Sequence, residues 1–207
     1  MNELKEQNLE VEIKFLVPEL APIRKQLLAS GATLKKPRTY ENNIRFDFPW
    51  DGLRQQGKLL RLRQDSVARL TFKGEPKQSI VSEVRVREEL EITVDDFSVT
   101  SALLERIGFE QRQVYEKYRE TFVLGSIEIV LDEMPYGDFV ELEGVETEIR
   151  EAAELLGFDW EKRILANYLA LMARLKEKFD LAFDDLTFDN FASVDASVAD
   201  ILPYALG

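Results

Sequence analysis

The sequence predicts an α+β fold with a mainly antiparallel sheet. Segments that alternate between apolar and polar residues, the two-residue period of a strand, recur along the chain, and helical patterns lie between some of them. The chain also resembles itself, because "LEVEIKF", "LLASGATL" and "YENNIRF" are followed in the same order by "EELEITV", "LLERIGFE" and "YEKYRETF". Two long matches in one order predict a sheet built from two pseudo-equivalent halves.

Each expected element follows from its own pattern. Strands are expected at residues 9–16, 41–48, 57–64, 68–74, 81–93, 113–124, 126–132 and 138–143. Helices are expected at residues 18–30, 95–107, 146–156 and 160–178. The first two helices end just before Gly31 and Gly108, and glycine readily adopts the conformation that stops a helix.

The composition excludes several classes of protein. The chain of 207 residues is 45% hydrophobic, enough for one packed domain, and it has no run of about 18 apolar residues that would suit a membrane span. Its net charge of -12 argues against a general basic surface for nucleic acid. Without cysteine or histidine, a metal site must use oxygen ligands, which favours Mg²⁺, Mn²⁺ or Ca²⁺ over zinc. The charged start shows no secretory signal, so we expect a cytoplasmic protein.

The composition changes from Phe179 onward. Residues 179–207 combine aspartates with apolar residues and contain no lysine or arginine. This segment is too apolar for a typical disordered tail, so we expect it to dock on apolar surface of this chain or of a partner, and a homodimer would provide one; disorder is the alternative. The expected division is a main domain over residues 1–178 and an acidic, apolar docking segment over residues 179–207.

Nearly every expected strand is apolar on one face and charged on the other. In the first strand Glu10, Glu12 and Lys14 share a face, because side chains two residues apart point the same way. The other strands continue the pattern with Arg61, Arg63, Arg69, Lys73, Glu83, Arg85, Arg87, Glu89, Glu91, Lys117, Arg119, Glu128, Asp132, Glu141 and Glu143.

Two interpretations of these charged faces are open. An open sheet would leave them in water, with cross-strand ion pairs that contribute about 0–1 kcal/mol each. A closed sheet would place them inside, where charges must pair or bind an ionic ligand. The faces are rich in Arg, Lys and Glu rather than Ser, Thr, Gln and Asn, which favours a ligand, and cations beside carboxylates suit a metal–polyphosphate complex. The sequence has neither a P-loop nor a dinucleotide-binding glycine pattern.

The ordered motifs resemble the CYTH superfamily, the triphosphate tunnel metalloenzymes. "EVEIKF" is similar to the Glu-x-Glu-x-Lys signature of that family, and "LRLR", "LTFKG", "REELE", "YEKYRETF" and "IVLDEMPYGDFVELEG" follow in order. The similarity extends over about residues 8–172, and residues 40–63 also resemble the bacterial branch called class IV adenylyl cyclase. The resemblance implies a closed eight-stranded antiparallel β-barrel with flanking helices, through which a triphosphate is threaded.

The resemblance also implies roles for individual residues. One or two Mg²⁺ or Mn²⁺ ions would be bound by Glu10, Glu12, Asp132, Glu141 and Glu143. The substrate would be held by Lys14, Arg61, Arg63, Lys73, Arg87, Lys117 and Arg119. Catalysis would depend on Glu12, Lys73, Glu89 and Glu91. Glu128 and Arg85 share the charged face but match the motifs less closely.

Two features are left open by the resemblance. Arg45 stands where the family usually has an aromatic residue, and its charge either extends the phosphate site or points outward. Bacterial relatives can supply a basic residue from the C-terminal helix, for which Arg163, Arg174 and Lys176 are the candidates.

Three functions are compatible with the sequence. The first is a metal-dependent triphosphatase acting on inorganic triphosphate, a nucleotide or thiamine triphosphate, because the recognisable residues serve metal or phosphate and none clearly serves a base or sugar. The alternative is a class IV adenylyl cyclase, which makes cyclic AMP and pyrophosphate from ATP. The third is a binding module for polyphosphate or a nucleoside triphosphate without catalysis. In each case the partner is a small molecule that carries a triphosphate, with no nucleic acid and no membrane.

Overall fold

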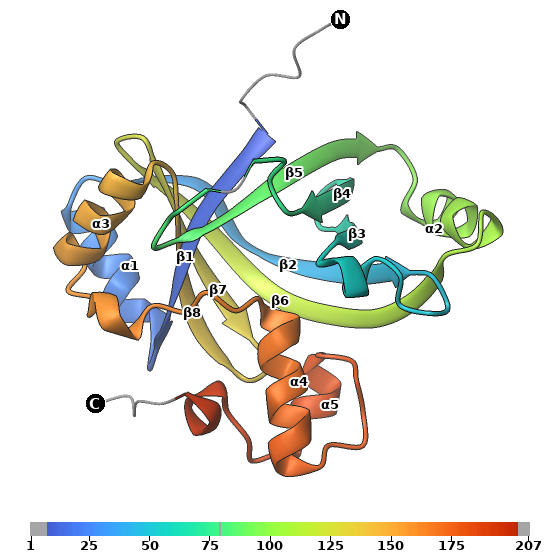
Figure 1. Ribbon diagram of the computed structural model, residues 1–207. Coiled ribbons are helices and arrows are strands. Elements are labelled where there is room, and N and C mark those ends of the chain that lie inside the picture. The colour runs from blue at the N-terminus through green and yellow to red at the C-terminus, as the bar shows by residue number, and fades with distance from the viewer. Residues whose placement is uncertain (1–7, 79, 203–207) are drawn as a thin grey trace, which may run out of the picture.

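The computed structural model describes residues 8–78 and 80–202 (Figure 1). Its strands are β1 (Leu9–Val17), β2 (Thr33–Asp47), β3 (Leu59–Gln64), β4 (Ala68–Gly74), β5 (Arg85–Val94), β6 (Glu110–Leu124), β7 (Ile127–Met134) and β8 (Gly137–Glu143). The α-helices are α1 (Leu20–Ala29), α2 (Phe97–Arg106), α3 (Glu146–Leu155), α4 (Tyr168–Phe179) and the short α5 (Phe188–Phe191). The prediction of an α+β fold with eight antiparallel strands is confirmed. The charged start, residues 1–7, lies outside the described residues.

The eight strands pair in a closed ring. Their order is β1-β5-β4-β3-β2-β6-β7-β8, and β8 pairs with β1, so that each of these strands has two antiparallel neighbours. Exchanging strands β1–β4 for β5–β8 maps this order onto itself, because β1 then takes the place of β5 and β2 that of β6. The topology therefore has the twofold repeat that the internal similarity predicts.

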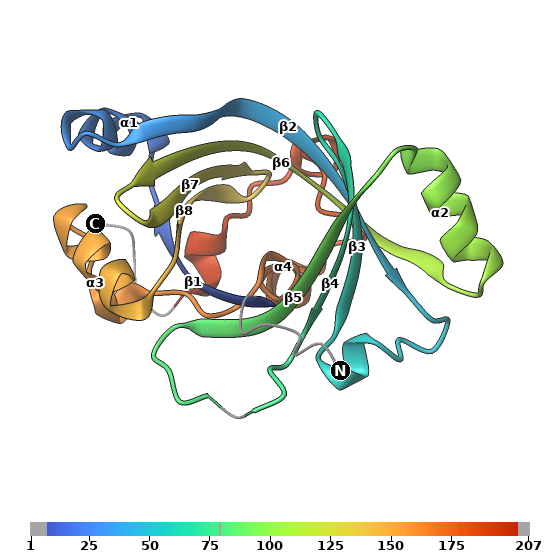
Figure 2. The same ribbon diagram turned by 90° about the horizontal axis from the view of Figure 1, so that it is seen from above.

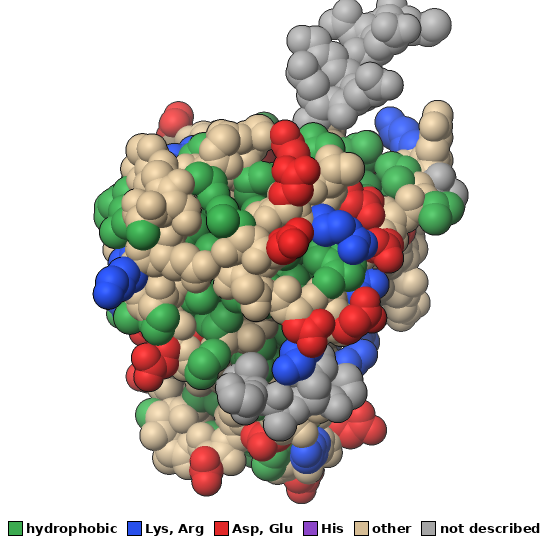
Figure 3. All heavy atoms as spheres, turned by 90° about the vertical axis from the view of Figure 1, so that its left-hand side faces the viewer, with side chains coloured by type: hydrophobic (Ala, Val, Ile, Leu, Met, Phe, Trp, Pro, Cys, Tyr) green, Lys and Arg blue, Asp and Glu red, His purple; other side chains and the backbone are tan. Residues whose placement is uncertain are grey.

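Three helices cover the apolar outer face of the barrel. Helix α2 covers β2 and β3, where Leu104 is buried with Phe46 and Leu62, and α1 and α3 cover the opposite part. Ile13, Ile129 and Leu142 point outward from β1, β7 and β8 and are fully buried together with Leu27 of α1 and Ile149 of α3. In the view from above, α1 and α3 lie outside this part of the wall (Figure 2). Acidic and basic side chains are interspersed with apolar ones over these helices (Figure 3). Because the outward positions are apolar, the alternate charged positions point into the barrel.

Helix α4 closes one end of the barrel, and the C-terminal segment packs on α4. Leu171 and Leu175 of α4 are buried against Tyr136 beside the β7–β8 turn. Leu186 follows at the same cluster, where its backbone exchanges hydrogen bonds with β6. Phe191 is buried there too. The acidic segment thus packs on its own chain up to residue 202, and it gives no separate reason to expect a dimer; residues 203–207 lie outside the described part.

Three expected elements differ from the structure by four or more residues at one end. One is the strand expected at residues 81–93, which begins only at Arg85 as β5. The single helix over residues 160–178 is wrong, because a 3-10 turn, η3 (Trp160–Lys162), is followed by extended chain and α4 begins only at Tyr168. The backbone N–H of Ile164 donates to the carbonyl of Lys14 in β1 at 2.8 Å, and this tertiary contact interrupts the helix. Strand β2 begins at Thr33, earlier than expected, because its first half is mostly exposed and polar and shows no clear alternation. Of the helices described, none combines the length and apolarity that a membrane span requires.

We expect the C-terminal segment to belong to the same cooperative unit as the barrel. Leu186→Ala should lower the free energy of unfolding by about 2–5 kcal/mol, since it leaves a cavity at a fully buried position. Leu28→Ala is the control, because Leu28 is 55% exposed and its truncation should cost no more than about 0.5 kcal/mol. Urea unfolding of both variants measures the difference, and equal midpoints would show that the segment unfolds independently.

Candidate active site

A cavity of about 960 Å³ lies inside the barrel. Side chains from all eight strands line it, together with the start of α4 and the loop before β3. The lining includes all but one of the site residues expected from the sequence, namely Glu10, Glu12, Lys14, Arg61, Arg63, Lys73, Arg87, Glu89, Glu91, Lys117, Arg119, Glu141 and Glu143. The structure therefore brings together residues that are up to 133 positions apart in the chain, from Glu10 to Glu143.

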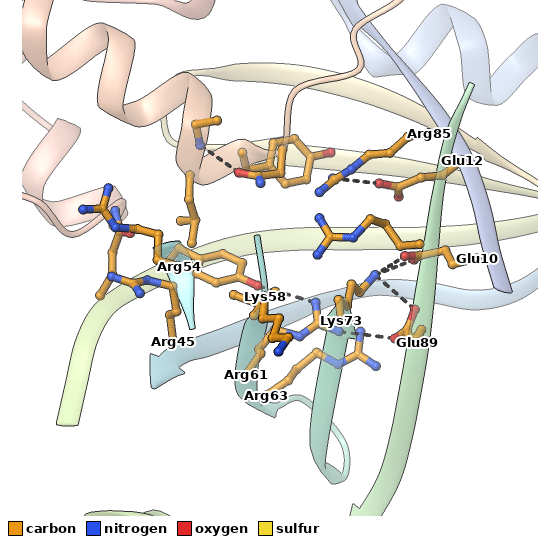
Figure 4. A pocket seen from close by; sticks show the side chains of 18 of the residues that line it. Glu10, Glu12, Arg45, Arg54, Lys58, Arg61, Arg63, Lys73, Arg85 and Glu89 are labelled. Atoms are coloured by element: carbon orange, nitrogen blue, oxygen red, sulfur yellow. Dashed lines mark hydrogen bonds and ion pairs between the residues drawn. The ribbon is translucent and has the colours of Figure 1, made fainter. Parts of the chain in front are cut away.

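The carboxylates of β1 are paired with cations from neighbouring strands. Lys73 Nζ of β4 lies 2.5 Å from both oxygens of Glu10 and 3.1 Å from Glu89 (Figure 4). Glu12 accepts hydrogen bonds from Lys14 at 3.2 Å and from Arg85 at 3.3 Å. In each pair the opposite charges offset part of the cost of burying them.

Carboxylates also gather at this side of the cavity. Glu143 of β8 lies opposite Glu12 of β1 on one side and Glu128 of β7 on the other. Burial, together with the nearby carboxylates of Glu10 and Glu128, raises the pKa of Glu143 to about 7. Such crowding of acidic groups would be relieved by a bound cation.

The donors at this position fit a hard divalent metal. Carboxylate oxygens are the protein ligands that Mg²⁺ and Mn²⁺ prefer. Among residues 8–78 and 80–202, however, no three acidic side chains already stand in a chelating arrangement. Glu10 and Glu12 are held by their cationic partners, so chelation requires these side chains to turn away from Lys73 and Arg85.

Asp132 is the expected site residue that does not line the cavity. It is fully buried, and its oxygens accept hydrogen bonds from Lys117 at 3.0 Å, from Arg119 at 2.7 and 2.5 Å and from the Tyr168 hydroxyl at 2.8 Å. The carboxylate is thus occupied in holding two cations of β6 in place. This position suits an anchor of the cations better than a metal ligand.

A second buried carboxylate joins the same network. Glu141 lies 2.5 Å from Arg119 and 3.4 Å from Lys14. Burial acts to raise the pKa of Glu141, but Lys14, Arg119 and Lys117 outweigh it and hold that pKa well below its usual range. The network fixes Lys14, Lys117 and Arg119 with their ammonium and guanidinium groups toward the cavity.

Each of the two arginines of β3, Arg61 and Arg63, has a donor nitrogen without a hydrogen-bond partner among the described residues. Arg61 donates to Thr71 at 3.1 Å, and Arg63 contacts Glu91 at 3.2 Å. The Nε atoms of both arginines are buried and have no hydrogen-bond partner within the described part of the chain. Both side chains line the cavity, so an anion bound there would contact their guanidinium groups.

Sequence reasoning missed two residues that support the site. Glu41 of β2 is fully buried within 3.7 Å of Lys117 and 3.9 Å of Arg63; burial opposes its ionisation, but these and other cations lower its pKa to about 2. Glu41 lies four residues before Arg45 in the expected strand, so alternation places both side chains on the same face of the sheet, and this could have indicated Glu41 as an inward residue. Tyr168 places its ring 5.4 Å from the Nζ atoms of Lys14 and Lys117, and no strand pattern could have revealed a residue of α4.

The structure shows where the residues lie whose roles the sequence left open. Arg45 points inward and lines the cavity, and so do Arg85 and Glu128. The candidates from the C-terminal helix are not in the lining. Lys176 instead pairs with Asp184 at 2.6 Å, Arg163 donates to the carbonyl of Trp160, and Arg174 is exposed. Helix α4 contributes Tyr168, Leu169, Ala170 and Ala173 in their place, and its N-cap residue Asn167 also lines the cavity.

Comparison with known proteins agrees with this geometry. The chain is 29% identical over 150 residues to a candidate adenylate cyclase of Methanocaldococcus jannaschii, a match that covers 72% of this chain and 83% of that protein. A solved structure of a candidate adenylate cyclase from Vibrio parahaemolyticus aligns with a TM-score of 0.72 at 20% identity, over 80% of this chain and 98% of that one. A candidate adenylyl cyclase from Hippeastrum, with a dominant triphosphatase activity, aligns with a TM-score of 0.56 at 23% identity, over 78% and 94% of the two chains.

The two solved structures show that the fold is shared. The model of the CYTH domain matches residues 8–165, a range that includes all eight strands and every residue expected at the site. Because this match spans most of the sequence, the chain belongs to the CYTH domain family.

Proposed function

We propose that the protein is a metal-dependent triphosphatase that hydrolyses inorganic triphosphate or a triphosphorylated organic compound. The observation that carries the proposal is the cation content of one cavity, which is faced by Lys14, Arg61, Arg63, Lys73, Arg87, Lys117 and Arg119. Many fixed cations suit a ligand with several phosphates, since ionic hydrogen bonds to phosphate oxygens are the strong ones. The triphosphatase activity of the Hippeastrum protein supports the same assignment.

The unpaired donors of Arg61 and Arg63 support a phosphate ligand. A buried donor without a partner costs about 1–3 kcal/mol, so each side chain would gain from a shift that brings this donor to an acceptor oxygen of the substrate. The guanidinium group is planar and offers two parallel donors, which matches the geometry of phosphate. Both arginines lie on one face of β3, so they would contact neighbouring parts of one extended anion.

The residues divide into two groups by the chemistry they would perform. Glu10, Glu12 and Glu143 would hold Mg²⁺ or Mn²⁺, which when bound supplies a Lewis acid and neutralises charge on the phosphates. Lys73 and the other cations would bind phosphate oxygens and stabilise the negative charge that develops as the terminal phosphoryl group is transferred to water. Of the two candidate carboxylates on β5, Glu89 is the better placed to orient that water, because it already lies 3.1 Å from Lys73.

An adenylyl cyclase is the second candidate. The names of the Methanocaldococcus and Vibrio relatives favour it. So does the cavity of about 960 Å³, which is near the upper end of the roughly 300–1,000 Å³ range of ligand pockets and has room for more than a triphosphate. In that reaction the 3′-hydroxyl of ATP would be the nucleophile, and the apolar side chains of Leu169, Ala170 and Ala173 would be available to the base.

Product analysis separates these functions. We expect orthophosphate from inorganic triphosphate and from ATP when the purified protein is incubated with Mg²⁺ or Mn²⁺, and no cyclic AMP. Chromatography and a phosphate assay measure the products, with heat-treated protein as the control. Cyclic AMP with pyrophosphate would replace the proposal by a cyclase, and tight binding of triphosphate without any product would replace it by a binding module.

Glu12→Gln should lower kcat at least about 100-fold while the fold is kept, because it removes a metal ligand and one charge from the carboxylate group without changing the size of the side chain. Glu154→Gln is a matched control, since Glu154 lies exposed on α3. Steady-state phosphate release and the melting temperature are measured for both variants. Full activity of Glu12→Gln would show that this carboxylate is not needed for the reaction.

Arg61→Ala should act mainly on substrate binding. The loss of charge-assisted hydrogen bonds, about 1.5–3 kcal/mol, corresponds to an increase in KM of about 10- to 100-fold. Arg106→Ala serves for comparison, because Arg106 is exposed in the last turn of α2. Initial rates over a range of triphosphate concentrations give the two constants, and a variant with unchanged KM would remove Arg61 from the proposed binding site.

A further inference from the structure

Three arginines meet at the end of the cavity that lies away from Glu10 and Glu12. Arg45 comes from β2, Arg54 from the turn η2 (Arg54–Gln56) and Arg112 from the start of β6, and all three line the cavity. In the close view Arg45 and Arg54 lie on one side of the pocket and the two glutamates on the other (Figure 4). We refer to Arg45, Arg54 and Arg112 as the arginine cluster.

Asp47 compensates only part of the positive charge of the arginine cluster, because its carboxylate is shared with backbone donors. Its carboxylate accepts the backbone N–H groups of Phe48, Leu53 and Arg54 at 2.8 to 3.0 Å, in addition to the guanidinium of Arg45 at 3.1 Å. Three backbone donors on one carboxylate fix the loop after β2 in place. The main structural task of Asp47 is therefore to hold this loop.

Two further acidic groups, Asp51 and Glu110, contact the arginine cluster. A single carboxylate, Asp51, lies 3.0 Å from Arg54, 3.5 Å from Arg112 and 4.0 Å from Arg45. Glu110 contacts Arg112 at 2.9 Å, but its side chain is half exposed, where an ion pair is weak. Burial lowers the pKa of Arg45, and the charges of Arg54 and Arg112 act in the same direction against the nearby carboxylates. An anion at this end of the cavity would therefore compete with these carboxylates for the three guanidinium groups.

The cluster continues the row of cations that face the proposed triphosphate site. Arg45 lies directly opposite Arg61 of β3, and on its other side it lies opposite Gln113 of β6. Opposite residues on neighbouring strands have side chains about 5 Å apart. An extended anion that contacts Arg61 would therefore meet Arg45 next, with no protein wall between them, since both line one cavity.

We propose that the arginine cluster binds a further phosphate of the substrate, so that the protein prefers linear phosphate chains longer than three. This inference rests on the proposed function, because it assumes that the first three phosphates occupy the cations around Arg61. Two sources share the chemistry, an inorganic polyphosphate and a nucleoside tetraphosphate. Arg45 and Arg112 are 11% and 32% exposed, whereas Arg54 is 68% exposed. Because ionic contacts are weaker at exposed positions, we expect Arg45 and Arg112 to determine the preference more than Arg54 does.

Equilibrium binding tests the inference without requiring turnover. Titration calorimetry of the full chain, without divalent metal, would give Kd values for inorganic triphosphate, inorganic tetraphosphate and adenosine 5′-tetraphosphate. We expect inorganic tetraphosphate to bind at least tenfold more tightly than triphosphate. Arg45→Gln and Arg112→Gln should each reduce this ratio to about threefold or less, whereas Arg106→Gln, on the outer face of α2, should keep it.

Two further variants distinguish an effect of the lost charge from an effect of a disturbed fold. Arg45→Lys and Arg112→Lys keep the charge and should keep most of the preference. If Arg45→Gln is unstable, because its pairing with Asp47 is lost, Arg112→Gln decides the question, since Arg112 is partly exposed and its loss leaves the Asp47 contacts of the loop in place. Melting temperatures of all variants establish which of them are folded.

The outcomes distinguish the inference from the proposed function. Equal Kd values for triphosphate and tetraphosphate in the unchanged protein, or a preference that survives both glutamine variants, would overturn the inference and leave the triphosphatase proposal intact. If the glutamine variants abolish the preference for tetraphosphate but the protein releases no phosphate, the arginine cluster is supported as a phosphate-binding site and the triphosphatase proposal is rejected. Tighter binding of adenosine 5′-tetraphosphate than of inorganic tetraphosphate would identify the nucleotide as the source.

Discussion

The burial of charged groups inside a closed ring of strands is the constraint on which the rest of the structure depends. Lys14, Lys117 and Asp132 are at most 2% exposed, and an unpaired charge at such a position would cost several kcal/mol. Each of the three therefore has an opposite charge within 3.2 Å. The apolar faces must then be buried outside the ring, which is why α1 and α3 lie against the outer wall and why α4 covers one end.

The same constraint explains why so much could be predicted from the sequence. Strand alternation assigns each side chain to one face, and the apolar face is unambiguous in residues such as Ile13 and Leu142. A face made of Arg, Lys and Glu rather than neutral polar residues is unusual for a wet sheet, and it correctly indicated an interior. The cavity-lining positions of Glu10, Arg61 and Arg119 follow from parity alone once the ring is closed.

What could not be predicted depends on contacts between distant segments. The break before α4 arises because Ile164 bonds to β1, and the inward position of Tyr168 follows from that break. The burial of Leu186 depends on hydrogen bonds to β6, which no local pattern encodes. Asp132 had the parity of a site residue, but only the structure shows that its oxygens are already taken by cations. Alternation gives the direction of a side chain and not the identity of its partner.

The ion pairs between the side chains that line the cavity also couple the two ligands of the proposed reaction. Lys73 holds Glu10, and Arg85 holds Glu12, so a phosphate that takes the cations leaves two carboxylates without partners. A divalent cation placed on the carboxylates would equally free the cations for phosphate. Each ligand thus pairs with the charged groups that the other leaves without partners. Binding of one therefore raises the affinity for the other, and by thermodynamic linkage this effect is the same in both directions. A cavity that bound anion and metal together in this way would favour the metal complex of a polyphosphate over either component alone, and such complexes are the form in which these substrates react.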